Sequence, residues 1–191
     1  MGVSDSPRIY DAIQVLAGRH VAQRRLRHAI SSVGNQKVLD VGAGTGSLAP
    51  LLPPDAVYWA LDNDPAKLRR LSIKVPYAHC VLGSALEIQL PDRAVDWTVC
   101  IAVAHHLDDG ELPQLFAELA RVTRHRLVFL DPLWTSKRGI ARLLWRYDRG
   151  SHPRSAETLL SALSEHFEIE QVERFRVLHE YILCSSRPVR E

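Results

Sequence analysis

The chain has 191 residues, 46% of them hydrophobic and 24% charged, with a formal net charge of +2. This length predicts one domain with enough apolar residues for a core on both faces of a sheet. The small net charge gives no reason to expect nucleic-acid binding, because a phosphate backbone requires several cations at once. The sequence contains no run of about eighteen consecutive apolar residues, so we expect neither a membrane span nor a secretory signal. The three cysteines, Cys80, Cys100 and Cys184, are typical of buried thiols in a reducing cytoplasm, so we expect a soluble cytoplasmic protein.

Helical and strand patterns alternate along the chain. Apolar residues recur at helical spacing over residues 7–32. Strands are expected at 37–41, 57–62, 78–82, 96–101 and 126–131, separated by helices at 45–52, 65–74 and 110–123. Helices at 135–148 and 154–165 follow, and then strands at 167–176 and 178–186, which a tight turn near Val177 joins as an antiparallel hairpin. Alternation of strand and helix predicts an α/β fold with a doubly wound, parallel sheet.

Three glycines at alternate positions follow the first predicted strand. Residues 38–46 read Val-Leu-Asp-Val-Gly-Ala-Gly-Thr-Gly, so an apolar run ends at Asp40 and leads into Gly42, Gly44 and Gly46. Glycines adopt positive φ and let backbone amides come close to a ligand. The next strand ends at Asp62, where a carboxylate can accept both hydroxyls of a ribose. These features predict a site for an adenosine-containing cofactor at the carboxyl ends of parallel strands.

The spacing of this turn separates the candidate cofactors. A phosphate-binding P-loop has the pattern Gly-x-x-x-x-Gly-Lys-Ser/Thr, and no lysine lies in the turn after Gly42, which argues against nucleoside triphosphate chemistry. A dinucleotide turn has the pattern Gly-x-Gly-x-x-Gly, whereas here Ser47 stands in place of the third glycine. An NAD(P)-dependent oxidoreductase, or a non-catalytic nucleotide-binding module on the same sheet, is therefore the alternative.

Residues 38–46, together with Ala-Leu-Asp-Asn-Asp-Pro at 60–65, resemble the class I S-adenosylmethionine-dependent methyltransferases. The resemblance continues through Val-Leu-Gly-Ser-Ala at 81–85, Asp-Trp-Thr-Val-Cys-Ile at 96–101 and Ala-His-His-Leu at 104–107, and it covers roughly residues 36–132. It implies S-adenosyl-L-methionine as the cofactor. It also implies a Rossmann-like, three-layer fold with a mostly parallel seven-stranded sheet of order 3-2-1-4-5-7-6, in which strand 7 is antiparallel.

The resemblance further implies which residues contact the cofactor. The counterpart of Asp40 lies under the amino acid moiety of the cofactor. Ser84 stands where many members carry Asp, so it would accept a hydrogen bond from the adenine amino group more weakly. The full expected set is Asp40, Gly42, Ala43, Gly44, Gly46, Asp62, Asn63, Ser84, Ala85 and Ile101.

His105 and His106 follow the fourth predicted strand, at the rim where a methyl acceptor would lie. Imidazole can take a proton from a hydroxyl as methyl transfer proceeds, so either histidine is a candidate catalytic base. The alternative is that the pair only packs and forms hydrogen bonds. The nearby Asp108 and Asp109 suit the start of a helix better than a metal site, and no metal is expected.

The segment after the fifth strand is rich in arginine and aromatic residues. In the resembling family an insert at this point often walls the acceptor pocket, which makes Trp134, Tyr147, His152 and Arg154 candidate acceptor-binding residues. Guanidinium groups would recognise a carboxylate or phosphate, and aromatic rings an apolar acceptor. A core-covering helix with a solvated basic face is the simpler alternative, and a basic amphipathic helix could also contact a membrane surface.

We therefore expect a single domain over 1–191. It would comprise the N-terminal helix 7–32, a cofactor-binding core 36–132, a lid-like helical insert 133–165 and a C-terminal hairpin 167–186.

The class of acceptor follows from signatures that the sequence lacks. Enzymes that methylate exocyclic amines of nucleic-acid bases carry Asn/Asp-Pro-Pro-aromatic after the fourth strand, where this chain has Ile-Ala-Val-Ala at 101–104. No Pro-Cys nucleophile for pyrimidine C5 methylation occurs either. We expect in-line methyl transfer to a small-molecule or lipid-like acceptor, for which the protein must align the reactants and exclude water.

Overall fold

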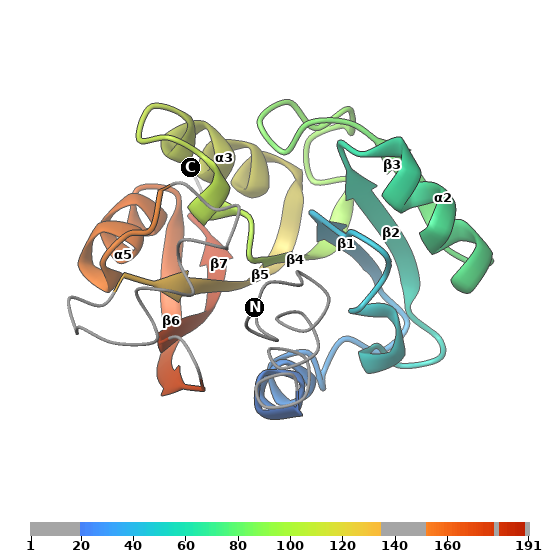
Figure 1. The fold of residues 1–191 in the computed structure, drawn as a ribbon, viewed down its shortest axis with the longest axis horizontal. Coiled ribbons are helices and arrows are strands. Elements are labelled where there is room, and N and C mark those ends of the chain that lie inside the picture. Colours follow the sequence, from blue (N-terminus) through green and yellow to red (C-terminus); the bar gives the residue numbers. More distant parts are fainter. Residues whose placement is uncertain (1–19, 135–151, 178–179, 190–191) are drawn as a thin grey trace, which may run out of the picture.

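The computed structural model describes residues 20–134, 152–177 and 180–189 (Figure 1). These residues form a seven-stranded sheet of order β3-β2-β1-β4-β5-β7-β6. The strands are β1 (Lys37–Val41), β2 (Val57–Asp62), β3 (His79–Leu82), β4 (Val95–Ile101), β5 (Thr123–Leu133), β6 (Phe167–Arg176) and β7 (Glu180–Pro188). Strands β1 to β5 pair in parallel, and β7 runs antiparallel to both neighbours. The predicted order and the predicted direction of the seventh strand are both confirmed.

Helices cover both faces of this sheet. They are α2 (Pro65–Lys74), α3 (Glu111–Val122) and α5 (Ala156–Ser164), with 3-10 turns η1 (Ala49–Leu51) and η2 (Ala104–His106), and residues 20–29 are also helical. Successive strand residues face opposite sides. Leu39 and Val41 of β1 therefore pack with α3 and α5, whereas Val38 packs with α2 and helix 20–29. Figure 1 shows this three-layer arrangement.

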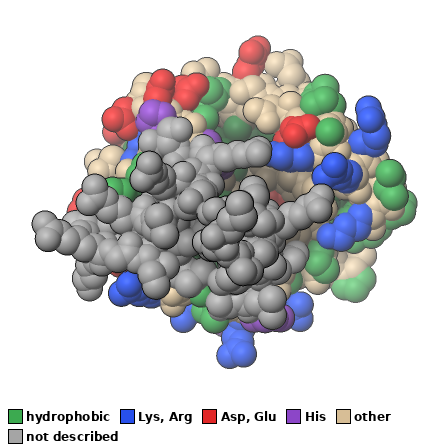
Figure 2. All heavy atoms as spheres, viewed as in Figure 1, with side chains coloured by type: hydrophobic (Ala, Val, Ile, Leu, Met, Phe, Trp, Pro, Cys, Tyr) green, Lys and Arg blue, Asp and Glu red, His purple; other side chains and the backbone are tan. Residues whose placement is uncertain are grey.

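Local sequence signals explain where α2 begins. Asp64 is its N-cap, and one carboxylate oxygen accepts the backbone amides of Ala66 and Lys67, while Pro65 occupies the first helical position. This helix has the predicted bounds. Its cations Lys67, Arg69, Arg70 and Lys74 are exposed, and Figure 2 shows Lys and Arg side chains gathered over α2.

Two expectations are corrected. The helix predicted over 45–52 is only the single turn η1, because Pro50 lies within it and Pro53 and Pro54 follow, so amide donors for a longer helix are missing. Cys80 was expected to be buried but is exposed on β3, which is an edge strand, whereas Cys100 and Cys184 are buried as expected.

Some predictions fall on residues that are not described. Residues 7–19 of the N-terminal helix, the helix at 135–148 and the hairpin turn at 178–179 lie outside the described residues. Within the described ranges, no helix is both long and apolar enough to cross a bilayer.

Candidate functional site

The glycine turn after β1 is attached to the end of β2. The amides of Gly42 and Ala43 both donate to the carbonyl oxygen of Leu61, at 2.9 and 3.0 Å. Gly42, Gly44 and Gly46 all have positive φ, of 73°, 55° and 80°. The turn therefore follows a backbone path that other L-residues rarely adopt, and its alternate glycines are explained by that path.

The three glycines differ in what surrounds them. A Cβ on Gly42 would lie 2.5 Å from Val103 Cγ2, and a Cβ on Gly46 would lie 3.0 Å from Leu71 Cγ. These two glycines therefore let the turn pack against the loop after β4 and against α2. Among the described residues, nothing lies within 4 Å of a Cβ placed on Gly44. The described residues therefore leave space open beside Gly44 at the carboxyl ends of β1 and β2, where the sequence predicts a cofactor.

Asp62 shapes this opening from the end of β2. Its side chain is buried, and its two oxygens accept the amides of Gly44 at 2.8 Å and Asp64 at 2.9 Å, with Lys67 Nζ at 3.8 Å. A carboxylate offers about four acceptor positions. Two backbone amides therefore leave Asp62 with capacity for the hydroxyls of a ribose.

Asp40 is a second buried carboxylate close to the turn. Its Oδ2 accepts the hydroxyl of Tyr58 at 2.7 Å. Burial raises the pKa of Asp40 to about 7, and the charge of Asp62 adds to the rise, while the hydrogen bond from Tyr58 opposes it. Tyr58 is a functional candidate that sequence reasoning missed, because in the sequence its hydroxyl belongs to an apolar strand run. A cation bound nearby would favour the ionised form of Asp40.

The remaining predicted cofactor residues lie at neighbouring strand ends. Ser84 is exposed after β3, and its Oγ accepts the amide of Leu86 at 3.1 Å. Ala85 and Ile101 are half-buried, Ala43 is buried and Asn63 is exposed. The topology thus brings together the ends of β1, β2, β3 and β4, as predicted.

A carboxylate at the end of β5 holds the loop after β4. Asp131 is buried, its Oδ2 accepts the amide of Ala104 at 2.9 Å, and its Oδ1 lies 3.1 Å from His105 Nδ1. His105 is 4% exposed, whereas His106 is exposed, and their ring centroids are 4.1 Å apart. Sequence reasoning missed Asp131 as a site residue. The available signal was a charged residue at the carboxyl end of an apolar strand next to β4.

Arg154 occupies the other side of the same loop. It is buried, and its guanidinium donates to the carbonyl oxygens of Ala104 (2.8 Å), Leu107 (2.7 Å) and His152 (3.3 Å) and to the carboxylate of Asp109 (2.9 Å). Nη2 also lies 2.9 Å from that carboxylate, so all three guanidinium nitrogens have partners within the chain. This arrangement favours a role in holding the loop over the predicted contact with an acceptor.

Two other predicted acceptor residues are described, Trp134 directly after β5 and His152 shortly before α5. The amide of Trp134 donates to the carbonyl of Arg154 at 2.8 Å, and the amide of His152 donates to the carbonyl of His105 at 3.0 Å. The Trp134 side chain is 47% exposed. Tyr147 lies outside the described residues. The structure thus places His152 beside the loop that carries the two histidines, and Trp134 beside Arg154.

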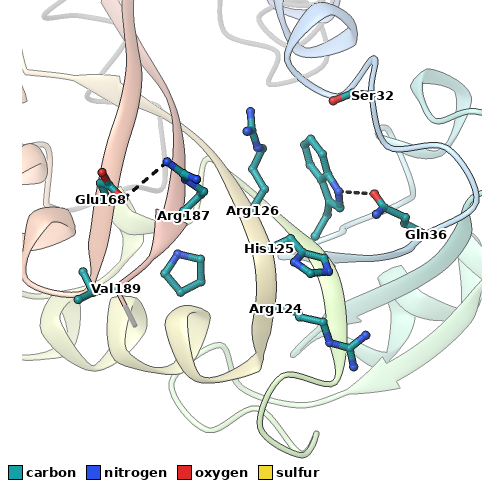
Figure 3. Close-up of a pocket in the computed structure, with 10 residues that line it drawn as sticks. Ser32, Gln36, Arg124, His125, Arg126, Glu168, Arg187 and Val189 are labelled. Carbon is teal, nitrogen blue, oxygen red and sulfur yellow. Dashed lines mark hydrogen bonds and ion pairs between the residues drawn. The ribbon is translucent and has the colours of Figure 1, made fainter. Parts of the chain in front are cut away.

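A groove of about 870 Å³ lies at the opposite ends of the strands (Figure 3). It is lined by Trp97 near the start of β4, by Arg124 and Arg126 at the start of β5, and by Arg187 near the end of β7. These arginines form ion pairs with Asp96 or Glu170, at 2.5 to 2.9 Å. Its size alone does not make this groove the functional site, because its cations are already paired and the glycine turn is at the other edge of the sheet.

Comparison with known proteins agrees with the strand-end geometry. Residues 38–126 match the family model of the methyltransferase domain. This part of the chain, which is under half of its length, resembles a methyltransferase domain. An uncharacterized methyltransferase of Mycobacterium tuberculosis is 40% identical over 92 residues, which are 47% of this chain and 36% of that protein. The malonyl-[acyl-carrier protein] O-methyltransferase of Serratia marcescens is 35% identical over 116 residues, which are 60% of this chain and 44% of that protein. The matched region is thus less than half the length of these curated relatives.

Solved methyltransferases share the fold of this domain at low sequence identity. The magnesium protoporphyrin IX methyltransferase of Synechocystis, solved with bound SAH, has a TM-score of 0.74 at 14% identity, covering 90% of this chain and 84% of that one. The geranyl diphosphate C-methyltransferase of Streptomyces coelicolor has a TM-score of 0.73 at 12% identity, covering 90% and 81%. An S-adenosylmethionine-dependent methyltransferase of Mesorhizobium loti has a TM-score of 0.67 at 20% identity, covering 86% and 96%.

Proposed function

We propose that this domain transfers a methyl group from S-adenosyl-L-methionine to a small-molecule or lipid-like acceptor. The observation that carries the proposal is the space that the described residues leave open beside Gly44, whose amide donates to the carboxylate of Asp62. The match to the methyltransferase domain supports the same activity.

The residues at this opening fit the proposed cofactor. S-adenosyl-L-methionine carries a ribose, an ammonium and a positively charged sulfonium, which supplies the reactive methyl group when bound. Asp62 would accept the ribose hydroxyls, and the buried carboxylate of Asp40 would favour a cationic ligand. Gly42, Ala43, Gly44 and Gly46 would let the cofactor approach the backbone. Asn63, Ser84, Ala85 and Ile101 would line the remainder of the adenosine side.

The acceptor would lie on the side of the loop that carries His105. The amide of His152 donates to the carbonyl of His105 in this loop, and the amide of Trp134 donates to the carbonyl of Arg154, whose guanidinium holds the same loop. The names of the neighbours include geranyl diphosphate, magnesium protoporphyrin and malonyl-[acyl-carrier protein] methyltransferases, which supports an acceptor other than nucleic acid. In-line transfer needs alignment of the acceptor behind the methyl group and exclusion of water. Side chains that enclose the acceptor beside the loop after β4 would provide both.

Calorimetry with two matched pairs of variants tests the proposed cofactor site. Gly44 and Gly34 have nearly the same φ, 55° and 54°, and a Cβ on either would meet no atom of the described part of the chain within 4 Å. Gly44→Val and Gly34→Val should therefore lower stability to a similar extent, but only Gly44→Val should abolish binding of S-adenosylhomocysteine. Asp62 and Asp96 each accept a backbone amide at opposite ends of the sheet, so Asp62→Asn should weaken binding and Asp96→Asn should not.

The same experiment separates the alternative function. Absence of heat with S-adenosylmethionine and S-adenosylhomocysteine, together with saturable binding of NADH by fluorescence, would favour a dinucleotide-dependent oxidoreductase. Equal effects of the two glycine variants would also contradict the proposed site.

A further inference from the structure

Within the described residues, the three most exposed large apolar side chains all lie on neighbouring elements at one edge of the sheet. Ile73, which is 76% exposed, belongs to α2, Tyr77 (65%) follows this helix, and Leu82 (59%) ends β3. Single exposed apolar side chains are common on protein surfaces, whereas a group of them on adjacent elements indicates an interaction site.

The position of Ile73 follows from the period of α2. Leu68 and Leu71 are the buried residues of this helix, and 3.6 residues per turn place Ile73 on the opposite side. Arg69 and Arg70 lie one turn earlier on the same outer side, and both are exposed. The apolar surface of Ile73 stays in water in the folded protein, so burial in the core does not explain an isoleucine here.

The edge strand β3 continues this outer face. Val81 packs with the apolar cluster on the α3 side of the sheet, so the alternation of side chains along the strand directs Leu82 to the α2 side. The α2 surface is defined as the exposed side chains of Arg69, Arg70, Ile73, Lys74, Tyr77 and Leu82.

The α2 surface is cationic as well as partly apolar. Residues 65–86 contain four Lys or Arg residues but no Asp or Glu, in a chain whose total formal charge is only +2. Lys67 lies 3.8 Å from a carboxylate oxygen of Asp62, and the other three cations form no ion pair with the described residues. Figure 2 shows hydrophobic side chains among the Lys and Arg side chains over α2. This charge is therefore available to an anionic partner.

An anionic lipid surface fits these features better than two other partners. Cations that meet anionic headgroups, together with apolar side chains that enter the boundary of the acyl chains, are typical of protein surfaces that lie on membranes. In a two-fold symmetric dimer the α2 surfaces of both copies would meet, and their like charges would repel. A nucleic-acid backbone would attract the cations but would offer Ile73 no apolar environment.

We propose that the α2 surface docks this protein onto an anionic lipid bilayer. Its Lys and Arg side chains would lie among the headgroups, and Ile73 and Tyr77 would reach the acyl boundary. The amide of Asp64, the N-cap of α2, donates to Asp62, so this helix starts at the rim of the proposed cofactor opening. Docking would bring that opening close to a lipid-like acceptor, but the docking itself does not depend on methyl transfer.

Co-sedimentation with vesicles tests the role of the cations. Wild type should bind vesicles of equal parts phosphatidylcholine and phosphatidylglycerol, and should not bind phosphatidylcholine alone. The double variant Arg69→Gln and Arg70→Gln should lower the partition coefficient about 25-fold, because each cation near an anionic surface contributes about fivefold. Arg174→Gln with Arg176→Gln, on the opposite edge strand β6, removes the same charge and should leave binding unchanged.

A second pair of variants tests the apolar contact. Ile73→Gln should lower the partition coefficient about tenfold, which is the lower end of the effect of burying such a side chain. Val172, which is 45% exposed on β6, is the matched control, and Val172→Gln should leave binding unchanged. Because the replaced side chains are exposed, all variants should keep the unfolding temperature and the affinity for S-adenosylhomocysteine of wild type.

Three results would overturn the proposal. The first is absence of wild-type binding to the mixed vesicles, or equal losses in the α2 and β6 variants. The second is loss in the double arginine variant but not in Ile73→Gln, which would indicate a charge-only partner such as nucleic acid. The third is a dimer in analytical ultracentrifugation that Ile73→Gln dissociates, which would assign the α2 surface to a second copy. Failure of wild type to bind S-adenosylhomocysteine would contradict only the proposed function, because vesicle binding is measured without cofactor.

Discussion

Asp40 combines a buried carboxylate with a predicted role at the cofactor. Its side chain is 3% exposed and its pKa is raised from 3.8 to about 7, chiefly by burial. At a pH between these two pKa values, Asp40 keeps its proton in the folded protein but has lost it in the unfolded chain. The free energy of unfolding should therefore fall as the pH rises from about 4 to about 7 and level off above that, with a total contribution of about 4 kcal/mol.

Replacement of this carboxylate should separate stability from binding. Asp40→Asn removes the cost of ionisation and keeps an oxygen for the Tyr58 hydroxyl, so it should raise the free energy of unfolding by about 2 to 4 kcal/mol at pH 8. The gain should shrink as the pH falls below 7 and vanish only below about pH 4, where Asp40 is protonated in both the folded and the unfolded protein. Affinity for S-adenosylmethionine should fall because a carboxylate facing a cation is lost. Urea denaturation at pH 8 and at low pH measures the first effect, and a variant less stable than wild type at pH 8 would contradict it.

At the level of single residues, sequence reasoning found the groups whose type and spacing are unusual and missed those defined by tertiary contacts. The glycines and Asp62 follow from a local pattern at the ends of two strands, and the structure brings them together. Tyr58 has no such local pattern, because its partner Asp40 is distant in sequence. Asp131 does end an apolar strand, but the loop that it holds is also distant in sequence. Arg154 was assigned to the acceptor from its charge, but all three of its guanidinium nitrogens donate to groups of its own chain.

At the level of elements, the end of β4 carries a strained turn. Ala102 has φ of 55°, and its amide donates to Leu130 at 2.8 Å. This turn leads directly to Val103, which packs against Gly42. A non-glycine residue in the left-handed region costs roughly 1–2 kcal/mol. The strain therefore lies in the segment that joins the sheet to the loop bearing His105, as strain at functional sites often does.

Ala102→Gly should relieve this strain. The gain is offset by roughly 0.4–1 kcal/mol from the greater freedom of glycine in the unfolded chain, so stability should be unchanged or slightly higher. Ala117→Gly in the interior of α3 is the matched control, and it should lower stability by about 1 kcal/mol. Chemical denaturation of both variants measures the difference. Equal destabilisation by the two substitutions would show that the turn at Ala102 is not strained.

The accuracy of the predicted elements has a local physical basis. The bounds of β1, β2 and α2 were predicted to the residue because apolar runs, Asp64 and Pro65 mark them in the sequence. The helix predicted over 45–52 was wrong because its apolar residues pack against the core without forming a longer helix, and the prolines at 50, 53 and 54 limit it. The extension of β5 from 126 back to Thr123 went unpredicted, since it contains Arg124 and His125, which pair with Asp96 only in the folded chain.

At the level of the whole molecule, the edge of the sheet formed by the carboxyl ends of the parallel strands differs from the edge formed by their amino ends. The carboxyl edge gathers the glycine turn, Asp40, Asp62, Asp131 and His105 from four strands or their loops. The amino edge holds the groove of Figure 3, where Arg124, Arg126 and Arg187 are paired with carboxylates. Ligands of open α/β sheets bind outside the carboxyl ends of the strands, where neighbouring strands connect in opposite directions. In this sheet that position lies between β1 and β4.

Hydrogen–deuterium exchange with and without saturating S-adenosylhomocysteine tests this assignment most directly, because it locates the ligand along the chain. We predict slower exchange in residues 42–47, 62–64 and 102–107, with no change at 124–126 or 186–189. Protection confined to the amino edge, or no protection at the glycine turn despite measurable binding, would contradict the assignment of the cofactor site.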